Sequence, residues 1–258
     1  MNLKNLLATN LAIGLVSTCV QANNLSVIDG GLGVYDSITD ITWTSDANLL
    51  GTLESQQGFT TVVNAIIASS PIIQDIPNID DNGGSGSYSG IYDISAADFG
   101  AGGLVDWWGA QAFVNYLNYA NYGHSNQWAL PTTPDSNASF GNSQTSSQLG
   151  ELIYNELGGT EGSPIPRSPY FFHEQLNAYW FGTEYSPSPY YAWYFDTNNS
   201  YQIIDYKNAQ YYAWAVSPGE ASFLPVPSAV WLFGSGVLGI FGLKRRQGRH
   251  DADSFFLG

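Results

Sequence analysis

The sequence is short of cysteine and of basic residues. Its one cysteine, Cys19, lies in an apolar N-terminal segment. Without a thiol elsewhere, the body of the chain has no disulfides, thiolate metal ligands or cysteine nucleophiles. Of the seven lysines and arginines, only Arg167 and Lys207 lie between the two end segments, and the net charge is −15. An acidic body cannot hold a phosphate backbone electrostatically, so we expect no nucleic-acid partner.

Motifs for catalysis are also absent from the sequence. His124 and His173 stand alone, with no metal-spaced histidine pair, no Ser-His-Asp order and no nucleophile elbow. Acidic residues are so numerous that carboxylate pairs of the kind glycosidases use are uninformative. Charged residues make up 11% of the chain, about half the usual quarter. This acidic, lysine-poor composition is typical of secreted proteins. Because no catalytic motif is found, we predict that the protein is not an enzyme.

The N-terminal segment 1–22 has the pattern of a signal peptide. Lys4 supplies the positive start, residues 6–16 form a short apolar run, and Val20-Gln21-Ala22 places small residues where signal peptidase reads them. We expect cleavage after Ala22 and export to the cell envelope. Residues 16–19 also loosely resemble a lipobox, although Thr18 fits that pattern poorly, so lipidation of Cys19 is the alternative.

The body of the chain predicts an α+β domain. A small hairpin is expected at residues 34–43, and the aromatic runs of residues 179–218 are typical of antiparallel strands with polar turns. Helices are expected from apolar periodicity at residues 60–68, 106–121 and 143–157. Strands are expected at residues 127–132, 191–196, 200–206 and 211–216, the last three forming an antiparallel meander.

Two acidic stretches could bind a cation. Asp36, Asp40 and Asp46 could cluster around one, but aspartate also serves turns and caps, and we favour that role. The segment 80–90 faintly resembles a calcium loop, at Asp80, Asn82 and Gly84, but lacks the closing glutamate, so a surface loop is favoured. We therefore predict no cofactor and no metal site, with calcium left as an unsupported alternative.

The C-terminal segment combines a proline motif, an apolar run and a basic cluster. Val226-Pro227-Ser228-Ala229 precedes the apolar residues 230–243, and Lys244-Arg245-Arg246 follow. With its flanks the run can just cross a bilayer, and the basic cluster should stay on the cytoplasmic side.

This arrangement resembles the PEP-CTERM sorting signal in its VPLPA-like variant, although Ser228-Ala229 stand where Pro-Ala is common and the tail 247–258 is longer than usual. The resemblance implies an exosortase-type membrane enzyme as partner in a Gram-negative bacterium. The protein would be held in the inner membrane before processing, and would then reach the cell surface or the extracellular matrix.

The body resembles the Lcl C-terminal family, a domain of unknown function. The resemblance rests on residues 34–43, 108–112, 128–132, 179–185, 192–195 and 212–219, in that order. The family often has arginine where Ala129 and Ser217 stand, so any role of those arginines is absent here. The resemblance implies a fold related to C-type lectins and the formylglycine-generating enzyme, whose chemistry is excluded because it needs cysteines.

The expected organisation has five parts. A signal peptide (1–22) is followed by the Lcl C-terminal-like domain (23–220), a linker with the sorting motif (221–228), a transmembrane helix with its basic stop (229–246) and a tail (247–258).

An adhesin or polysaccharide-contacting module is the function we expect. Aromatic faces stack on sugar rings, and the side chains that could do so are Trp193, Tyr194, Tyr211 and Tyr212, although each also suits core packing. The alternatives are a structural matrix component without a specific ligand and a carboxylate-based glycan-active enzyme.

Deleting residues 226–258 should release the body into the periplasm or the medium, because the predicted membrane helix would be lost. Cell fractionation measures this. A truncated protein that stays in the membrane fraction would show that the sorting hypothesis is wrong or that Cys19 carries lipid.

Overall fold

Three antiparallel sheets make up the strand content of the computed structural model, which describes residues 24–75 and 90–221. The first sheet has the order β1-β2-β3-β9, formed by β1 (Leu25–Ile28), β2 (Gly33–Asp36), β3 (Ile41–Thr44) and β9 (Val216–Pro218). The second has the order β6-β7-β8, formed by β6 (Ala178–Glu184), β7 (Tyr191–Asp196) and β8 (Tyr201–Tyr206). The third is a hairpin of β4 (Ile72–Gln74) and β5 (Ile91–Asp93).

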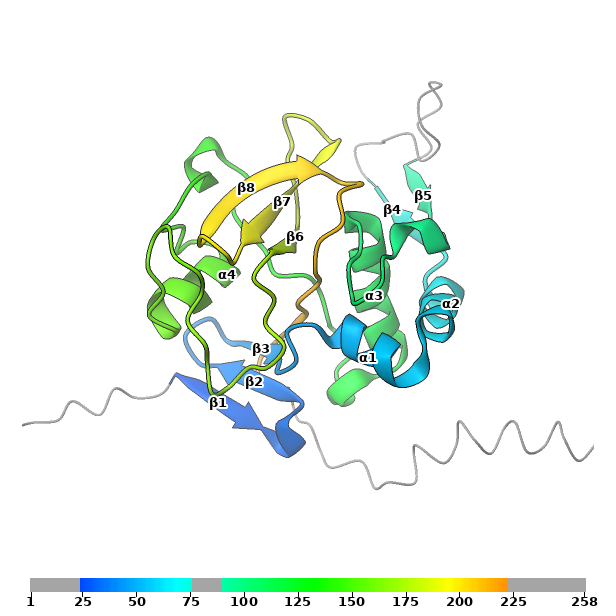
Figure 1. Ribbon diagram of the computed structural model, residues 1–258, viewed down its shortest axis with the longest axis horizontal. Coiled ribbons are helices and arrows are strands. Elements are labelled where there is room, and N and C mark those ends of the chain that lie inside the picture. Colours follow the sequence, from blue (N-terminus) through cyan, green and yellow to red (C-terminus); the bar gives the residue numbers. More distant parts are fainter. Residues whose placement is uncertain (1–23, 76–89, 222–258) are drawn as a thin grey trace, which may run out of the picture.

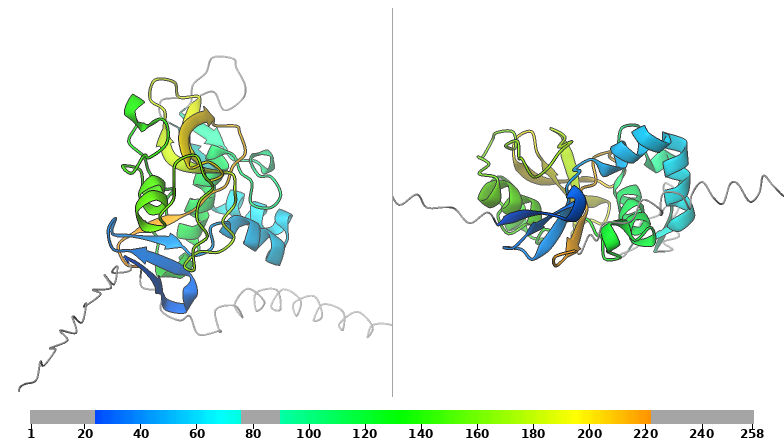
Figure 2. Two further views of the ribbon diagram at one scale, coloured as in Figure 1. Left: turned by 60° about the vertical axis from the view of Figure 1, so that its left-hand side comes forward. Right: turned by 90° about the horizontal axis from the view of Figure 1, so that it is seen from below.

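The helices lie on two sides of these sheets (Figures 1 and 2). On one side are α1 (Leu49–Gln57), α2 (Phe59–Ser69) and α3 (Trp107–Tyr119). On the other, α4 (Gln148–Glu151) continues into a π-helical turn, η5 (Leu152–Glu156). Short 3-10 turns are η1 (Asp29–Gly31), η2 (Ala96–Asp98), η3 (Tyr122–His124) and η4 (Asn137–Ser139). The chain is therefore a mixed α/β protein with antiparallel sheets.

Aromatic side chains fill the interior in two clusters. One lies between the three longer helices and β6, where Trp180 is fully buried. The other lies between the two larger sheets and α4, where Trp43 and Trp214 meet edge to face with ring centroids 5.2 Å apart. Such rings bury the largest apolar area per residue, so these two clusters supply most of the hydrophobic stabilisation.

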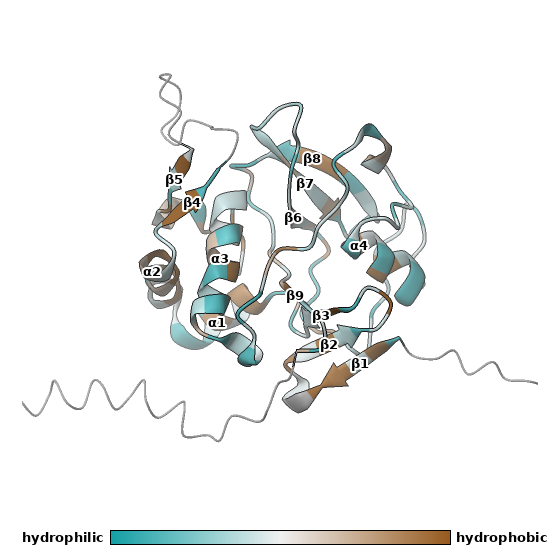
Figure 3. Ribbon diagram, turned by 180° about the vertical axis from the view of Figure 1, so that it is seen from behind, coloured by the Kyte–Doolittle hydropathy of each residue, from teal (hydrophilic) through white to brown (hydrophobic). Residues whose placement is uncertain are grey.

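The helix α3 forms as the sequence predicts. Asp106 caps its N-terminus by accepting a hydrogen bond from Gly109 N at 2.8 Å. Hydrophilic and hydrophobic residues alternate along it (Figure 3), and Trp108, Ala112 and Leu117 are among its buried residues. The hairpin β2–β3, the helix α2 and the strands β7 and β8 also confirm the sequence-based expectations.

The helix expected at residues 143–157 begins later than predicted. Ser143 has a left-handed backbone with φ of 58°, and Gln144 Nε2 donates to Phe140 O and Asn142 O. These local bonds hold residues 143–147 in a turn, because a polar side chain can compete with the helix for backbone groups. Ser147 then caps α4 by accepting from Gly150 N.

Two expected strands are not formed as predicted. Residues 127–132 make one isolated bridge, between Ala129 and Val216. Pro131 has no backbone N–H and therefore cannot donate a hydrogen bond to a neighbouring strand. In the segment 211–216, Tyr211 and Tyr212 make single bridges, and Val216 alone joins β9, which pairs with β3. The third strand of the meander is therefore β6.

The membrane prediction is not addressed by the described part of the chain. In residues 24–75 and 90–221, no helix is long and apolar enough to cross a bilayer. The signal peptide 1–22, the calcium-like residues Asp80, Asn82 and Gly84, and the sorting segment 226–246 lie outside those residues.

A buried carboxyl pair makes stability depend on pH. Asp98 and Asp106 are both buried, and burial, followed by the negative charge of Asp98, raises the pKa of Asp106 from 3.8 to about 8. The folded state thus keeps a proton that the unfolded chain releases between these two pKa values. The unfolding free energy contributed by this group is present at low pH and is lost as pH rises toward 8.

Replacing Asp106→Asn should remove this dependence, because a carboxamide still caps α3 but does not ionise. Thermal or chemical unfolding measures this. The unfolding free energy of the variant, relative to that of the wild type, should rise by more than about 2 kcal/mol between about pH 5 and pH 8. Parallel pH profiles for the two proteins would contradict the assignment.

Candidate functional site

A buried lysine joins two carboxylates and two indoles. Lys207 is 1% exposed, and its Nζ lies 2.6 Å from Asp75 Oδ1 and 3.3 Å from Glu184 Oε2. The ammonium also lies 4.4 Å from the ring centroid of Trp107 and 5.7 Å from that of Trp108. We call these five residues the Lys207 cluster.

The cluster ties together four elements that are distant in sequence. Asp75 directly follows β4, Trp107 and Trp108 open α3, Glu184 ends β6, and Lys207 directly follows β8. Two further hydrogen bonds join α3 to the residues that follow β4 and β8. Trp108 Nε1 donates to Asp75 Oδ2 at 2.8 Å, and Trp107 N donates to Lys207 O at 2.9 Å. A charge buried this deeply is tolerated only when it is paired, so the cluster must form as a unit.

Glu184 is the member of the cluster that reaches solvent. Its side chain is 21% exposed, and its Oε2 makes no hydrogen bond with a described residue, so the contact with Lys207 is electrostatic. Burial raises the pKa of Glu184 to about 7, with Lys207 opposing and Asp75 reinforcing the rise. Near neutral pH this carboxyl can therefore either donate or accept a hydrogen bond.

Glu184 opens onto a pocket of about 420 Å³ between β4, α3 and β6. The side chains of Gln74 and Gln111 make no hydrogen bond to the described residues and are free to serve a ligand. Ile72, which is 45% exposed, adds an apolar wall. We call this the Glu184 pocket; its lining residues are Ile72, Ile73, Gln74, Trp107, Gln111, Asn115, Gly182 and Glu184.

The chemistry of the Glu184 pocket suits a small neutral ligand rich in hydroxyl groups. Amides offer both donors and acceptors, and a carboxylate offers strong acceptors. Trp107 is only 3% exposed and carries Lys207 over its ring, so the indole offers little surface for a sugar ring to stack on. The volume lies within the range of about 300–1,000 Å³ that is usual for small-molecule sites.

The four aromatics proposed from sequence as glycan contacts lie elsewhere. Trp193 is fully buried and contacts Phe140 and Tyr185, so a sugar ring has no access to it. Tyr212 is half-buried and packs against Tyr179.

Tyr194 and Tyr211 are also half-buried, and they pack against each other and against Trp180. The hydroxyl of Tyr211 donates to Asp205 Oδ2. None of the four lines the Glu184 pocket.

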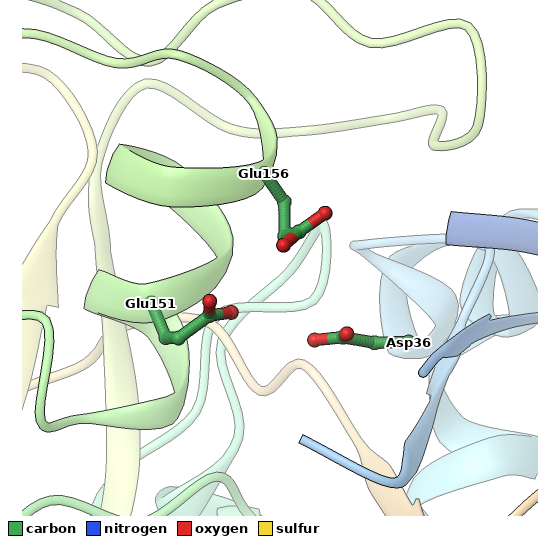
Figure 4. A group of neighbouring side chains, drawn as sticks. All are labelled: Asp36, Glu151 and Glu156. Carbon is green, nitrogen blue, oxygen red and sulfur yellow. The ribbon is translucent and has the colours of Figure 1, made fainter. Parts of the chain in front are cut away.

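Three carboxylates converge at a second place (Figure 4). Asp36 of β2 points toward Glu151 and Glu156 of the α4–η5 helix, and one oxygen of each lies within 4.8 Å of the other two. Burial first, and then neighbouring Asp36, raises the pKa of both glutamates. Carboxylate oxygens are the ligands that calcium prefers, so these three residues could hold a cation.

Asp36 and Asp46 have the turn roles expected from the sequence; Asp46 Oδ1 accepts from Asn48 N. Asp36 accepts from Ile38 N and Thr39 Oγ1, and Asp40 accepts from Tyr35 Oη. Asp36, Asp40 and Asp46 are not the group that converges. The partners of Asp36 lie more than a hundred residues away, where no local pattern pointed to them.

A threonine, a histidine and an aspartate also meet, but not as a catalytic triad. Thr52 Oγ1 donates to Asp46 Oδ2 at 2.6 Å, and His173 Nδ1 lies 3.1 Å from the same hydroxyl and 3.1 Å from Asp46 Oδ2. A triad needs the aspartate on one ring nitrogen and the nucleophile on the other. Here a single nitrogen faces both partners, which excludes that mechanism.

The architecture defines a mixed α/β domain with antiparallel sheets and a small polar pocket beside a buried ion pair. Residues 33–217, more than half of the chain, match the Lcl C-terminal domain, and the chain belongs to that family. No curated protein and no solved structure matches the chain.

Replacing Lys207→Met should lower the unfolding free energy by about 3–5 kcal/mol, because it leaves the buried Asp75 and the partly exposed Glu184 without their cation. Denaturant titration measures this. The control is Arg167→Met, since Arg167 is exposed and should change stability by no more than about 0.5 kcal/mol. Equal, small losses in both variants would show that the cluster does not hold the fold.

Proposed function

We propose that this protein is an exported surface module that contacts extracellular polysaccharide through the Glu184 pocket. The observation that carries the proposal is the set of unpaired polar groups in that pocket. Gln74 and Gln111 have no partner among the described residues, and the carboxyl of Glu184, whose Oε2 is buried against Lys207, lines the same pocket with its side chain 21% exposed. A neutral sugar supplies hydroxyl groups for such atoms and C–H faces for Ile72.

Export supports the same proposal. The signal-peptide pattern of residues 1–22 and the PEP-CTERM-like segment 226–246 favour sorting by an exosortase-type enzyme to the cell surface or matrix. We also propose that the fold is related to C-type lectins and the formylglycine-generating enzyme. The mixed α/β architecture with antiparallel sheets is compatible with that relation.

A glycan-active enzyme is less well supported than a binding module. A carboxyl with a pKa of about 7 suits general acid catalysis, and Glu184 has one. Hydrolysis of a glycoside normally needs a second carboxylate across the bond. Asp75 does not line the pocket, and its oxygens are engaged by Lys207 and Trp108.

Binding to a glycan array and to exopolysaccharide, with calcium and with chelator, tests the proposal. We expect saturable binding of a neutral sugar class that Gln111→Leu weakens by about tenfold, the cost of one or two lost hydrogen bonds. Gln57→Leu, at an exposed glutamine at the end of α1, is the matched control and should bind like the wild type.

Comparing binding in calcium with binding in chelator distinguishes the three-carboxylate group from the Glu184 pocket. Loss of binding in chelator would indicate that a calcium ion held by Asp36, Glu151 and Glu156 is needed for binding. Binding that is independent of calcium would indicate that the Glu184 pocket binds the sugar without it. Failure of the folded protein to bind any glycan in either condition would contradict the proposal and favour a structural matrix component.

A further inference from the structure

A second pocket, of about 540 Å³, lies within the long connection between η5 and β6. All of its lining residues belong to the segment 164–176, and none of them lines the Glu184 pocket. This connection is anchored to the strand side of the molecule: Phe172 N donates to Ser45 O at 3.0 Å, and Ala47 N donates to Phe172 O at 2.9 Å. We call this cavity the Arg167 pocket.

The Arg167 pocket holds one charge of each sign, and the two do not pair. Arg167 and Glu174 both line it. Neither side chain makes an ion pair or a hydrogen bond with another residue of the segments 24–75 and 90–221. Lys207, the other basic residue of these segments, is paired with Asp75 and Glu184. Arg167 is therefore the lysine or arginine side chain of these segments that can bind a ligand.

The apolar walls of the pocket are exposed to an unusual degree. Phe172 is 44% exposed and Leu176 is 60% exposed, while Ile165, which also lines the pocket, is buried at 7% exposure. Exposed large apolar side chains that border a cavity favour a ligand that covers them. The wall residues are suited to one compact apolar side chain.

His173 completes the polar rim in a constrained conformation. Its backbone is left-handed with φ of 59°, and its Nδ1 lies 3.2 Å and 3.1 Å from the two oxygens of the buried carboxyl of Asp46. Left-handed backbone at a residue other than glycine is uncommon and costs free energy, and such strain gathers at functional sites. With Nδ1 engaged by Asp46, the other ring nitrogen, Nε2, is available to a ligand.

We propose that the Arg167 pocket binds a short zwitterionic peptide with an apolar side chain. The guanidinium of Arg167 suits bidentate contact with the terminal carboxylate, Glu174 suits the terminal ammonium, and Phe172 and Leu176 cover the side chain. A simple anion would approach a protein of net charge −15 against its overall field, whereas a zwitterion has no net charge to repel. This inference is independent of the proposed polysaccharide contact.

Isothermal titration of the full-length protein in detergent with glycyl-L-leucine, a zwitterionic dipeptide with one compact apolar side chain, tests the inference. We expect saturable 1:1 binding. Acetylating the amine or amidating the carboxylate should each weaken binding by about tenfold or more, because each removes one charge-assisted contact. No saturable binding by folded protein, or equal binding of the three peptides, would overturn the inference.

Two variants assign the contacts. Arg167→Gln should lose the preference for the free carboxylate over the amide, and Glu174→Gln should lose the preference for the free amine over the acetylated form. Glu161→Gln changes an exposed acid that does not line the pocket and should keep both preferences. If both pocket variants keep both preferences, the peptide binds elsewhere and the assignment to this pocket is wrong.

Discussion

The buried ion pair of Lys207 with Asp75 and Glu184 is the interaction on which the rest of the structure depends. It joins the end of β4, the start of α3, the end of β6 and the end of β8 at one point. These elements contribute side chains to both apolar clusters, Trp107 and Trp180 to one and Phe181 to the other. The hydrophobic effect is non-directional, so it does not by itself fix the register between packed elements. A buried cation that requires specific partners supplies that register, at a cost in desolvation that the surrounding indoles and carboxylates offset.

Local sequence patterns predicted the elements whose causes are local. The helix α3 follows from its Asp106 cap and apolar stripe, and the hairpin β2–β3 follows from its turn. The errors arose where distant residues decide the outcome. Whether Val216 pairs with β3 or continues a meander depends on where β3 lies, and the side chain of Gln144 delays the start of α4.

The candidate site was not predicted, although one signal for it was present. A lone lysine in the body of an acidic chain must find a carboxylate if it is buried, and Lys207 is such a residue. The sequence does not say which of many acids it meets, because Asp75 lies more than a hundred residues away. The aromatic runs predicted glycan contacts instead, but Trp193 lies in the core, because large rings gain most from burial.

Glu184 shares a largely buried ion-pair site with Lys207 and Asp75 while lining the pocket. The most direct test is an NMR titration of the Glu184 side-chain carboxyl carbon in the folded protein. We expect a midpoint at about pH 7, far above the ordinary pKa of 4.5. A midpoint near 4.5 would show that burial does not dominate the titration of this carboxyl, and would contradict the description of Glu184 as a largely buried group at the edge of the pocket.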